Sequence, residues 1–317
     1  MTDSTLPSLT REPLGRTGME VSRVGFGTGS IGGFYGEMDD KRAAEIVERV
    51  LELGINYIDT STYYGEAERR LGKALAGHRD DIYLATKAGR YGDDDFDFSP
   101  NALRASLERS LGLLHTDYVD VFMLHDIEFV PQEEIFAESL DTLRALKSEG
   151  KCRAIGISGY PMKTMSRAVS EAEVDVVLTY AHGTLLDDSI TSTLGPLADE
   201  HGVGLINAAS LVMGLLTPNG ARADSAHRAS AEAKRAAERM SQICRVHGAD
   251  LAFVANQYSI QQSGCVMTMI GAGSERHIEE AIVAASTPID EALLTELLAV
   301  RPPVESRQWL SGLEENN

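Results

Sequence analysis

Residues 57–75 read YIDTSTYYGEAERRLGKAL. The stretch begins with a short apolar run, passes through a polar connection, and continues into a segment whose apolar residues recur at helical spacing. It is therefore predicted to be one buried strand followed by one helix. Two polar residues stand in this connection: Asp59 ends the apolar run, and Tyr64 follows five residues later.

The same strand-then-helix unit recurs along almost the whole chain. The predicted strands are near-continuous apolar runs, as expected of parallel strands that are buried on both faces. Eight such units, with no Pro-, Gly- or Ser-rich linker between them, predict an α/β fold, a closed (β/α)8 TIM barrel, in which residues 1–317 form a single domain. The predicted strands are residues 21–29, 57–61, 82–89, 118–126, 152–159, 174–182, 203–210 and 265–273.

Several helix boundaries are also marked in the sequence. One helix is predicted to begin at an Asp39 cap and to end at Gly54, and another begins with Ser99 as N-cap and Pro100 at its first position. A solvated helix is predicted from about Ser230, whereas 217–229 are either a flap over a cofactor or part of the outer surface. The acidic stretch 92–98 is a surface loop or a border of the substrate mouth.

Composition argues against several classes of partner. The 317 residues carry a formal net charge of −19, which disfavours nucleic acid and anionic membranes as partners, because both attract basic surfaces. Three widely spaced cysteines support neither a disulfide framework nor a zinc site. The N-terminal residues contain no apolar segment of the kind found in secretory signals. These features favour a cytoplasmic protein, and they leave open whether it is a monomer or a homo-oligomer.

The motif GTGSIG, residues 27–32, matches the glycine pattern of dinucleotide-binding loops. In that fingerprint the helix opens directly at the loop, so that its N-terminus meets the pyrophosphate. Here the residues 33–40 intervene, and the helix is predicted to start only near Asp39. The sequence therefore disfavours a Rossmann domain.

Four polar residues follow or end three consecutive predicted strands: Asp59, Tyr64, Lys87 and His125. Each has a structural alternative, since Asp59 could cap a helix and Tyr64 or His125 could simply pack. Lys87 follows an apolar run, so its ammonium is expected to be buried and to need a nearby anion, which Asp59 can supply. A cation next to Tyr64 is expected to lower its phenol pKa toward working pH. His125 is expected to orient a substrate oxygen, in redox chemistry that relies on a cofactor.

The residues DTSTYYG (59–65), ATKAG (85–89) and LHD (124–126) resemble the motifs of the aldo-keto reductase family. That resemblance implies a catalytic tetrad of Asp59, Tyr64, Lys87 and His125, and it extends from the segment 13–29 to the segment 270–282. HDIEF (125–129) and neighbouring motifs resemble the branch that contains L-galactose dehydrogenase and the L-fucose (D-threo-aldose) 1-dehydrogenases. This branch implies oxidation of the anomeric carbon of a sugar to an aldonolactone with NAD.

The resemblance also implies a set of cofactor contacts, with some departures from the wider family. Ser158-Gly159 stands where many members have Ser-Asn, Leu178 replaces a glutamine, and Ala208 replaces the tyrosine that stacks on the nicotinamide. Tyr180 is a candidate replacement for that stacking residue, with a packing role as the alternative. The implied cofactor-binding residues are Gly27, Thr28, Gly29, Ser158, Gly159, Tyr180, Ser210, Leu211, Met213, Gly214, Leu215, Gly271, Ala272, Gly273, His277 and Glu280.

The choice between NAD and NADP is read from the segment after the eighth strand. In relatives that prefer NADPH, cationic residues there bind the 2′-phosphate. Here His277 stands where an arginine is common, Arg276 is the nearest fixed cation, and Glu275 would repel a phosphate. NAD is therefore predicted as the cofactor, with NADP disfavoured.

Three functions remain open at this point. The first is an NAD-dependent sugar 1-dehydrogenase acting on L-galactose, L-fucose or D-arabinose. The second is an oxidoreductase for another carbonyl or hemiacetal, for which pyridoxal is the form to test. The third is a non-catalytic cofactor-binding regulator, against which the complete tetrad counts.

Overall fold

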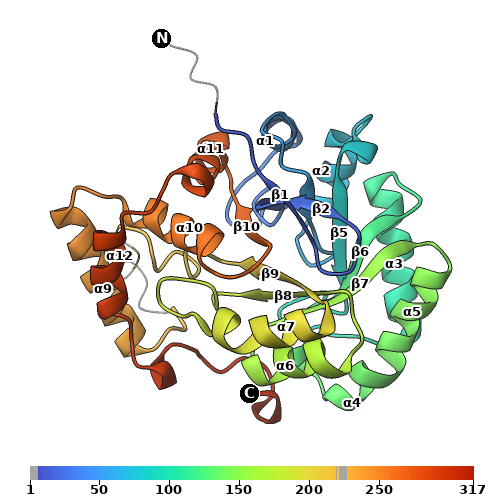
Figure 1. The fold of residues 1–317 in the computed structure, drawn as a ribbon. Coiled ribbons are helices and arrows are strands. Elements are labelled where there is room, and N and C mark those ends of the chain that lie inside the picture. Colours follow the sequence, from blue (N-terminus) through green and yellow to red (C-terminus); the bar gives the residue numbers. More distant parts are fainter. Residues whose placement is uncertain (1–5, 219, 221–226) are drawn as a thin grey trace.

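Eight parallel strands form a closed barrel in the computed structural model, which describes residues 6–218, 220 and 227–317 (Figure 1). The ring is closed because the strand Met267–Gly271 pairs both with Val24–Gly27 and with Gly204–Ala208. The predicted (β/α)8 barrel is confirmed. In order around the ring the strands are β10 (Met267–Gly271), β3 (Val24–Gly27), β4 (Tyr57–Asp59), β5 (Tyr83–Ala88), β6 (Val119–Leu124), β7 (Cys152–Gly159), β8 (Val176–Tyr180) and β9 (Gly204–Ala208).

The prediction of one continuous strand over 21–29 is wrong, because the structure divides this segment between two strands. Its beginning belongs to a separate antiparallel hairpin of β1 (Arg11–Pro13) and β2 (Glu20–Ser22), and only β3 enters the barrel. Leu14, Met19 and Val21 of this hairpin pack with interior residues of the barrel, so the hairpin closes one end of it.

Helices surround the barrel (Figure 1), and their predicted boundaries agree with the structure. Asp39 accepts a hydrogen bond from the Arg42 amide, and Ser99 accepts one from the Ala102 amide. The helices are α1 (Asp40–Glu52), α2 (Ala67–Ala74), α3 (Pro100–Leu114), α4 (Gln132–Glu134), α5 (Leu140–Ser148), α6 (Met162–Glu171), α7 (Gly195–His201), α9 (Ala231–Val246), α10 (Leu251–Gln261), α11 (Glu275–Ser286) and α12 (Glu291–Ala299). Short 3-10 segments span Arg79–Asp81, Ile127–Phe129, Val304–Ser306 and Glu314–Asn316.

Two of the helices begin in a wider, π-helical turn. Ile135–Ser139 leads into α5, and Ile190–Leu194 leads into α7. The solvated helix predicted from about Ser230 is confirmed, since α9 begins directly after Ser230 as its N-cap. Of the open segment 217–229, residues 219 and 221–226 lie outside the described residues.

The largest apolar cluster lies between the strands and the surrounding helices, and a second one fills the barrel interior. Both strand faces are therefore buried, which explains the near-continuous apolar runs. Within the described residues, no helix is both long enough and apolar enough to span a membrane.

Candidate functional site

The four predicted catalytic residues meet at the carboxyl ends of three consecutive strands. Asp59 ends β4, Lys87 lies near the end of β5, His125 directly follows β6, and Tyr64 lies in the loop between β4 and α2. In the strand register Asp59 pairs with Ala85, and Lys87 lies two residues further on the same face. The parallel register thus brings the carboxylate and the ammonium into contact, as the sequence predicted.

Lys87 is deeply buried and paired. Its Nζ contacts Asp59 Oδ1 and donates to the Thr60 carbonyl oxygen at 3.0 Å, and only 1% of the residue is exposed. Burial alone would lower the pKa of Lys87, but its interactions with the Asp59 carboxylate and with Tyr64 outweigh burial and raise that pKa. Burial raises the pKa of Asp59 despite the nearby ammonium. The lysine therefore stays charged beside the phenol.

The expectation that Lys87 would bring the phenol pKa of Tyr64 down to working pH is wrong. The Lys87 Nζ lies 4.9 Å from the centroid of the Tyr64 ring and does lower this pKa. Burial acts in the opposite direction and is the larger effect, so the net result raises the pKa of Tyr64 to about 12. Tyr64 is thus a phenol that can donate a proton at neutral pH.

His125 completes the group as a neutral ring. Burial is the main cause that lowers its pKa to about 3, and Lys87 and Arg90 act in the same direction. The His125 ring lies edge-on to Tyr64, with 5.6 Å between the ring centroids. Its Nδ1 is 2.9 Å from the Ser61 hydroxyl. A neutral imidazole with one nitrogen engaged can offer the other nitrogen to a substrate oxygen.

An ion pair beside His125 was not predicted from the sequence. Arg90 Nη1 bonds Asp126 Oδ2 at 2.5 Å, its Nη2 donates to the Tyr63 hydroxyl at 3.1 Å, and its guanidinium lies 4.1 Å from the centroid of the Tyr63 ring. Asp126 Oδ2 is 3.7 Å from His125 Nε2. Asp126 is part of the quoted HDIEF motif, but nothing in the motif indicated its partner.

The acidic loop 92–98 reaches this ion pair. Asp93 accepts a hydrogen bond from the Tyr63 hydroxyl at 2.5 Å, and Arg90 forms an isolated antiparallel bridge with Phe96. The Tyr63 ring in turn lies 5.9 Å from the His125 ring. The loop therefore contacts residues next to the four candidates.

The glycine motif 27–32 does not open a helix, because α1 starts only at Asp40. Gly27 ends β3, next to Asp59 on β4, and the Thr28 amide donates to the Asp59 carbonyl oxygen at 3.0 Å. A Cβ on Gly32 would lie 2.0 Å from the Tyr64 carbonyl oxygen. At Gly32 the motif thus lets the Tyr64 loop approach closely, and the rejection of a Rossmann loop is confirmed.

The departures from the wider family have a packing explanation at one position. A Cβ on Gly159 would lie 2.7 Å from Glu128 Oε2, so an asparagine at this position would clash with Glu128. Glu128 is 0% exposed, and its Oε1 accepts a hydrogen bond from the Ser311 hydroxyl at 3.1 Å. Burial, with a contribution from Asp126, raises the pKa of Glu128 to about 8.

Two other predicted residues, Ser158 and Tyr180, lie at the ends of β7 and β8. The Ser158 hydroxyl donates to the Leu124 carbonyl oxygen at 3.3 Å. Tyr180 ends β8, and its ring lies 5.1 Å from that of Tyr160, which stacks on Trp309. This contact supports the packing alternative for Tyr180, while its stacking on a nicotinamide stays a prediction.

Two backbone features fit a nicotinamide dinucleotide. After β9, the turn 210–216 places Val212, Met213 and Gly214 at positive φ, and a Cβ on Gly214 would meet nothing within 4 Å. After β10, Gly273 has the same open space, and the Ser274 side chain makes no hydrogen bond to the start of α11. A helix start without a side-chain cap and open glycines suit a pyrophosphate that lies against the backbone.

The charges at the start of α11 are already paired. Arg42 of α1 forms a two-point contact with the Glu275 carboxylate. Arg276, the candidate phosphate ligand, donates instead to Glu280 at 2.8 Å. Both cations here thus have carboxylate partners.

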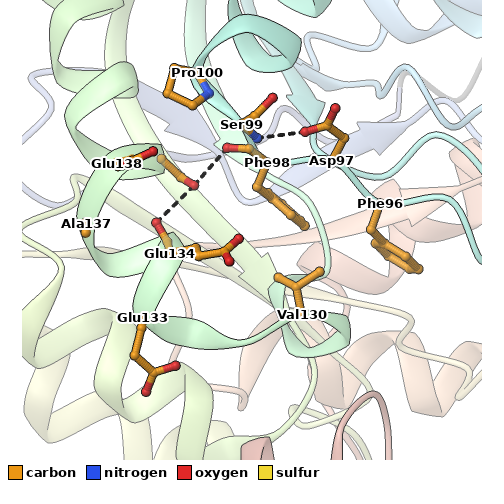
Figure 2. Close-up of a pocket in the computed structure, with 11 residues that line it drawn as sticks. Phe96, Asp97, Phe98, Ser99, Pro100, Val130, Glu133, Glu134, Ala137 and Glu138 are labelled. Atoms are coloured by element: carbon orange, nitrogen blue, oxygen red, sulfur yellow. Dashed lines mark hydrogen bonds between the residues drawn. The ribbon is translucent and has the colours of Figure 1, made fainter.

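A separate hollow of about 580 Å³ lies between the acidic loop and the π-helical turn before α5 (Figure 2). None of the four catalytic candidates lines it. The Ser139 hydroxyl in its wall already donates to the Phe98 carbonyl oxygen at 2.9 Å. The lining residues are Phe96, Asp97, Phe98, Ser99, Pro100, Val130, Glu133, Glu134, Ala137, Glu138 and Ser139.

A (β/α)8 barrel that gathers a tyrosine, a lysine, an aspartate and a histidine at its carboxyl end is suited to NAD(P)-dependent oxidoreduction. The chain belongs to the aldo/keto reductase family: the family model matches residues 23–301. It is accordingly an NAD(P)-dependent oxidoreductase.

Several characterised proteins are similar to this chain over most of its length. L-galactose dehydrogenase of Arabidopsis thaliana is 38% identical over 315 residues, which cover 96% of this chain and 98% of that protein. D-threo-aldose 1-dehydrogenase of a Pseudomonas species is 27% identical, covering 93% and 98%. Among solved structures, the holo form of an aldo-keto reductase from Bacillus halodurans has a TM-score of 0.77 and 26% identity, covering 97% of this chain and 99% of that one.

Proposed function

We propose that this protein is an NAD-dependent aldose 1-dehydrogenase that oxidises the anomeric carbon of an L-galactose-, L-fucose- or D-arabinose-type sugar to an aldonolactone. The observation that carries the proposal is the grouping of Tyr64, Lys87 and His125 at the barrel mouth. The sugar class is supported by relatives of almost equal length that are named L-galactose dehydrogenase and D-threo-aldose 1-dehydrogenase.

Each residue has a defined task in this reaction. Tyr64, once deprotonated, takes the proton of the anomeric hydroxyl, and Lys87 stabilises its phenolate. Asp59 keeps Lys87 charged and in place. His125 donates to the sugar oxygen through Nε2 and so supports it as the C–O bond becomes a carbonyl. The bound nicotinamide supplies the ring that accepts the hydride from C1.

The proposed preference for NAD rests on the charges at the start of α11. A 2′-phosphate there would meet the Glu275 carboxylate, and Arg276 would have to leave Glu280 to bind it. The 2′-hydroxyl of NAD carries no charge, so it would not suffer this repulsion. We therefore expect NAD to bind more tightly than NADP.

The test is turnover by the purified protein with L-galactose, L-fucose, D-arabinose and pyridoxal, each with NAD and with NADP, followed by NADH or NADPH absorbance. Oxidation of one sugar with NAD, lost in Tyr64→Phe, supports the proposal and names the substrate. The control is Tyr91→Phe, which changes a tyrosine outside the four candidates. Turnover of pyridoxal alone would refute the sugar class, and no turnover of any substrate would refute the proposal.

A further inference from the structure

The mechanism needs His125 to present one particular ring nitrogen as a donor, and the structure indicates what selects it. Ser61 lies in the loop after β4, fully buried, with its hydroxyl oxygen 2.9 Å from His125 Nδ1. The same oxygen accepts a hydrogen bond from the Tyr63 amide at 3.1 Å. The serine is therefore held in place by the backbone that follows it.

The direction of the Ser61–His125 bond follows from counting donors and acceptors. The Ser61 oxygen already accepts from an amide, and among the described residues its hydroxyl proton has no hydrogen-bond acceptor other than His125 Nδ1. If Nδ1 carried the ring proton, the buried Ser61 proton would lack a partner, which is costly. The satisfied arrangement has Ser61 donating to an unprotonated Nδ1, with the ring proton on Nε2.

A second group acts on the other side of the ring. Asp126 Oδ2 lies 3.7 Å from His125 Nε2, too far for a hydrogen bond but close enough for its charge to favour a proton there. Arg90 holds this carboxylate in place. Nε2 itself makes no hydrogen bond to any described residue, so its proton is available to a substrate oxygen.

We propose that Ser61 is a positioning residue that fixes His125 as the neutral tautomer with its proton on Nε2. The inference rests on the proposed function, since it concerns the group that would hold the sugar oxygen. With the opposite tautomer, the lone pair of Nε2 would face that oxygen and compete with Tyr64 for the hydroxyl proton. Ser61 would thus act on the reaction only through the imidazole.

The tautomer can be measured directly by NMR of the ring nitrogens in protein labelled on histidine. His125 is identified by the signals that disappear in His125→Asn. We expect a protonated Nε2 and an unprotonated Nδ1 in the natural protein, at neutral pH and without substrate. A protonated Nδ1 would overturn the proposal, whatever the variants do.

Variants then test the cause. Ser61→Ala should give His125 a mixture of tautomers and lower kcat about tenfold, roughly 1.4 kcal/mol, with KM much less affected. Ser61→Thr, which keeps the hydroxyl, should restore the single tautomer. If Ser61→Ala retains the Nε2–H tautomer alone, Ser61 is not its cause and the inference fails.

The chain offers a matched control in a second buried histidine. His182 Nδ1 lies 3.0 Å from the Ser189 hydroxyl, but that ring also contacts Asp187 at 2.9 Å and the Tyr160 carbonyl oxygen at 2.8 Å. Ser189→Ala therefore removes a comparable hydroxyl and should leave the His125 signals and turnover unchanged. The NMR result needs no substrate, so the two proposals can fail separately. The Nε2–H tautomer in a protein that oxidises no sugar would refute only the proposed function. Sugar oxidation by a protein whose His125 carries its proton on Nδ1 would refute only this inference.

Discussion

Replacement of Lys87 by methionine tests how the charge beneath Tyr64 affects proton transfer. The Lys87 Nζ lies 4.9 Å from the centroid of the Tyr64 ring. At that separation, with an effective dielectric constant of about 20, a phenolate and an ammonium attract each other by about 3 kcal/mol, roughly a hundredfold in the protonation equilibrium. Lys87→Met should therefore raise the pKa of Tyr64 further above its value of about 12.

The consequence for rate has a definite sign. Oxidation needs the deprotonated phenol, so below the pKa of Tyr64 the rate should rise with pH in the natural protein. In Lys87→Met the same rise should occur at higher pH, and at a fixed neutral pH the rate should be about 10- to 100-fold lower. The assay is the initial rate of sugar oxidation measured across a pH series with both substrates saturating.

Two controls separate this effect from damage to the fold. Lys87→Met alone leaves Asp59 buried without its cation, so the double variant Asp59→Asn/Lys87→Met removes both charges at once. Lys73→Met removes an exposed lysine that pairs with Asp40, and its pH profile should match that of the natural protein. The reasoning is refuted if a folded Lys87→Met protein has an unshifted profile, or one shifted to lower pH.

Three further outcomes follow from contacts described above. Gly159→Ala should lower the free energy of unfolding by about 1–3 kcal/mol in urea titrations, because the new methyl would lie 2.7 Å from Glu128 Oε2; Gly112→Ala, at an open helical position, should be neutral or stabilising. The folded-state pKa of Glu128, about 8, lies above its unfolded value, so its contribution to stability is full at acid pH and is lost as pH rises from about 4.5 to about 8. Over that pH range the free energy of unfolding of the natural protein, measured by urea titration, should therefore fall by up to a few kcal/mol relative to that of Glu128→Gln. The same dependence of unfolding free energy on pH in both proteins would contradict this. Glu275→Gln should narrow the ratio of the NADP and NAD dissociation constants severalfold in calorimetry, and an unchanged ratio would remove Glu275 from the explanation of cofactor choice.

The barrel could be predicted because its signal repeats along the chain. Buried parallel strands impose apolar runs, and each following helix adds boundary residues such as Asp39 and Ser99. The hairpin β1–β2 was missed because strands of three residues are too short to show a period, and its second strand merges in sequence with the apolar run of β3.

At the site, the sequence predicted the Asp59–Lys87 contact, which follows from strand positions. It did not predict the Arg90–Asp126 contact, which depends on loop conformation. Asp59 and Lys87 lie on adjacent parallel strands, so their meeting follows from the fold. The pairing of Arg90 with Asp126 depends on a left-handed backbone at Asp126, with φ 54°, which no residue pattern indicated. The direction of the Tyr64 pKa shift was wrong because it depends on the balance of burial against charge.

The stack of Tyr160 on Trp309 gives the molecule a built-in optical probe. Trp309 is the single tryptophan of the chain, so ultraviolet emission on excitation of indole comes from one known position. Tyr160, on which it stacks with 4.2 Å between the ring centroids, also contacts Tyr180 at the end of β8. Reduced nicotinamide absorbs in the range where indole emits, so energy transfer from Trp309 would report cofactor arrival at the barrel mouth without any label.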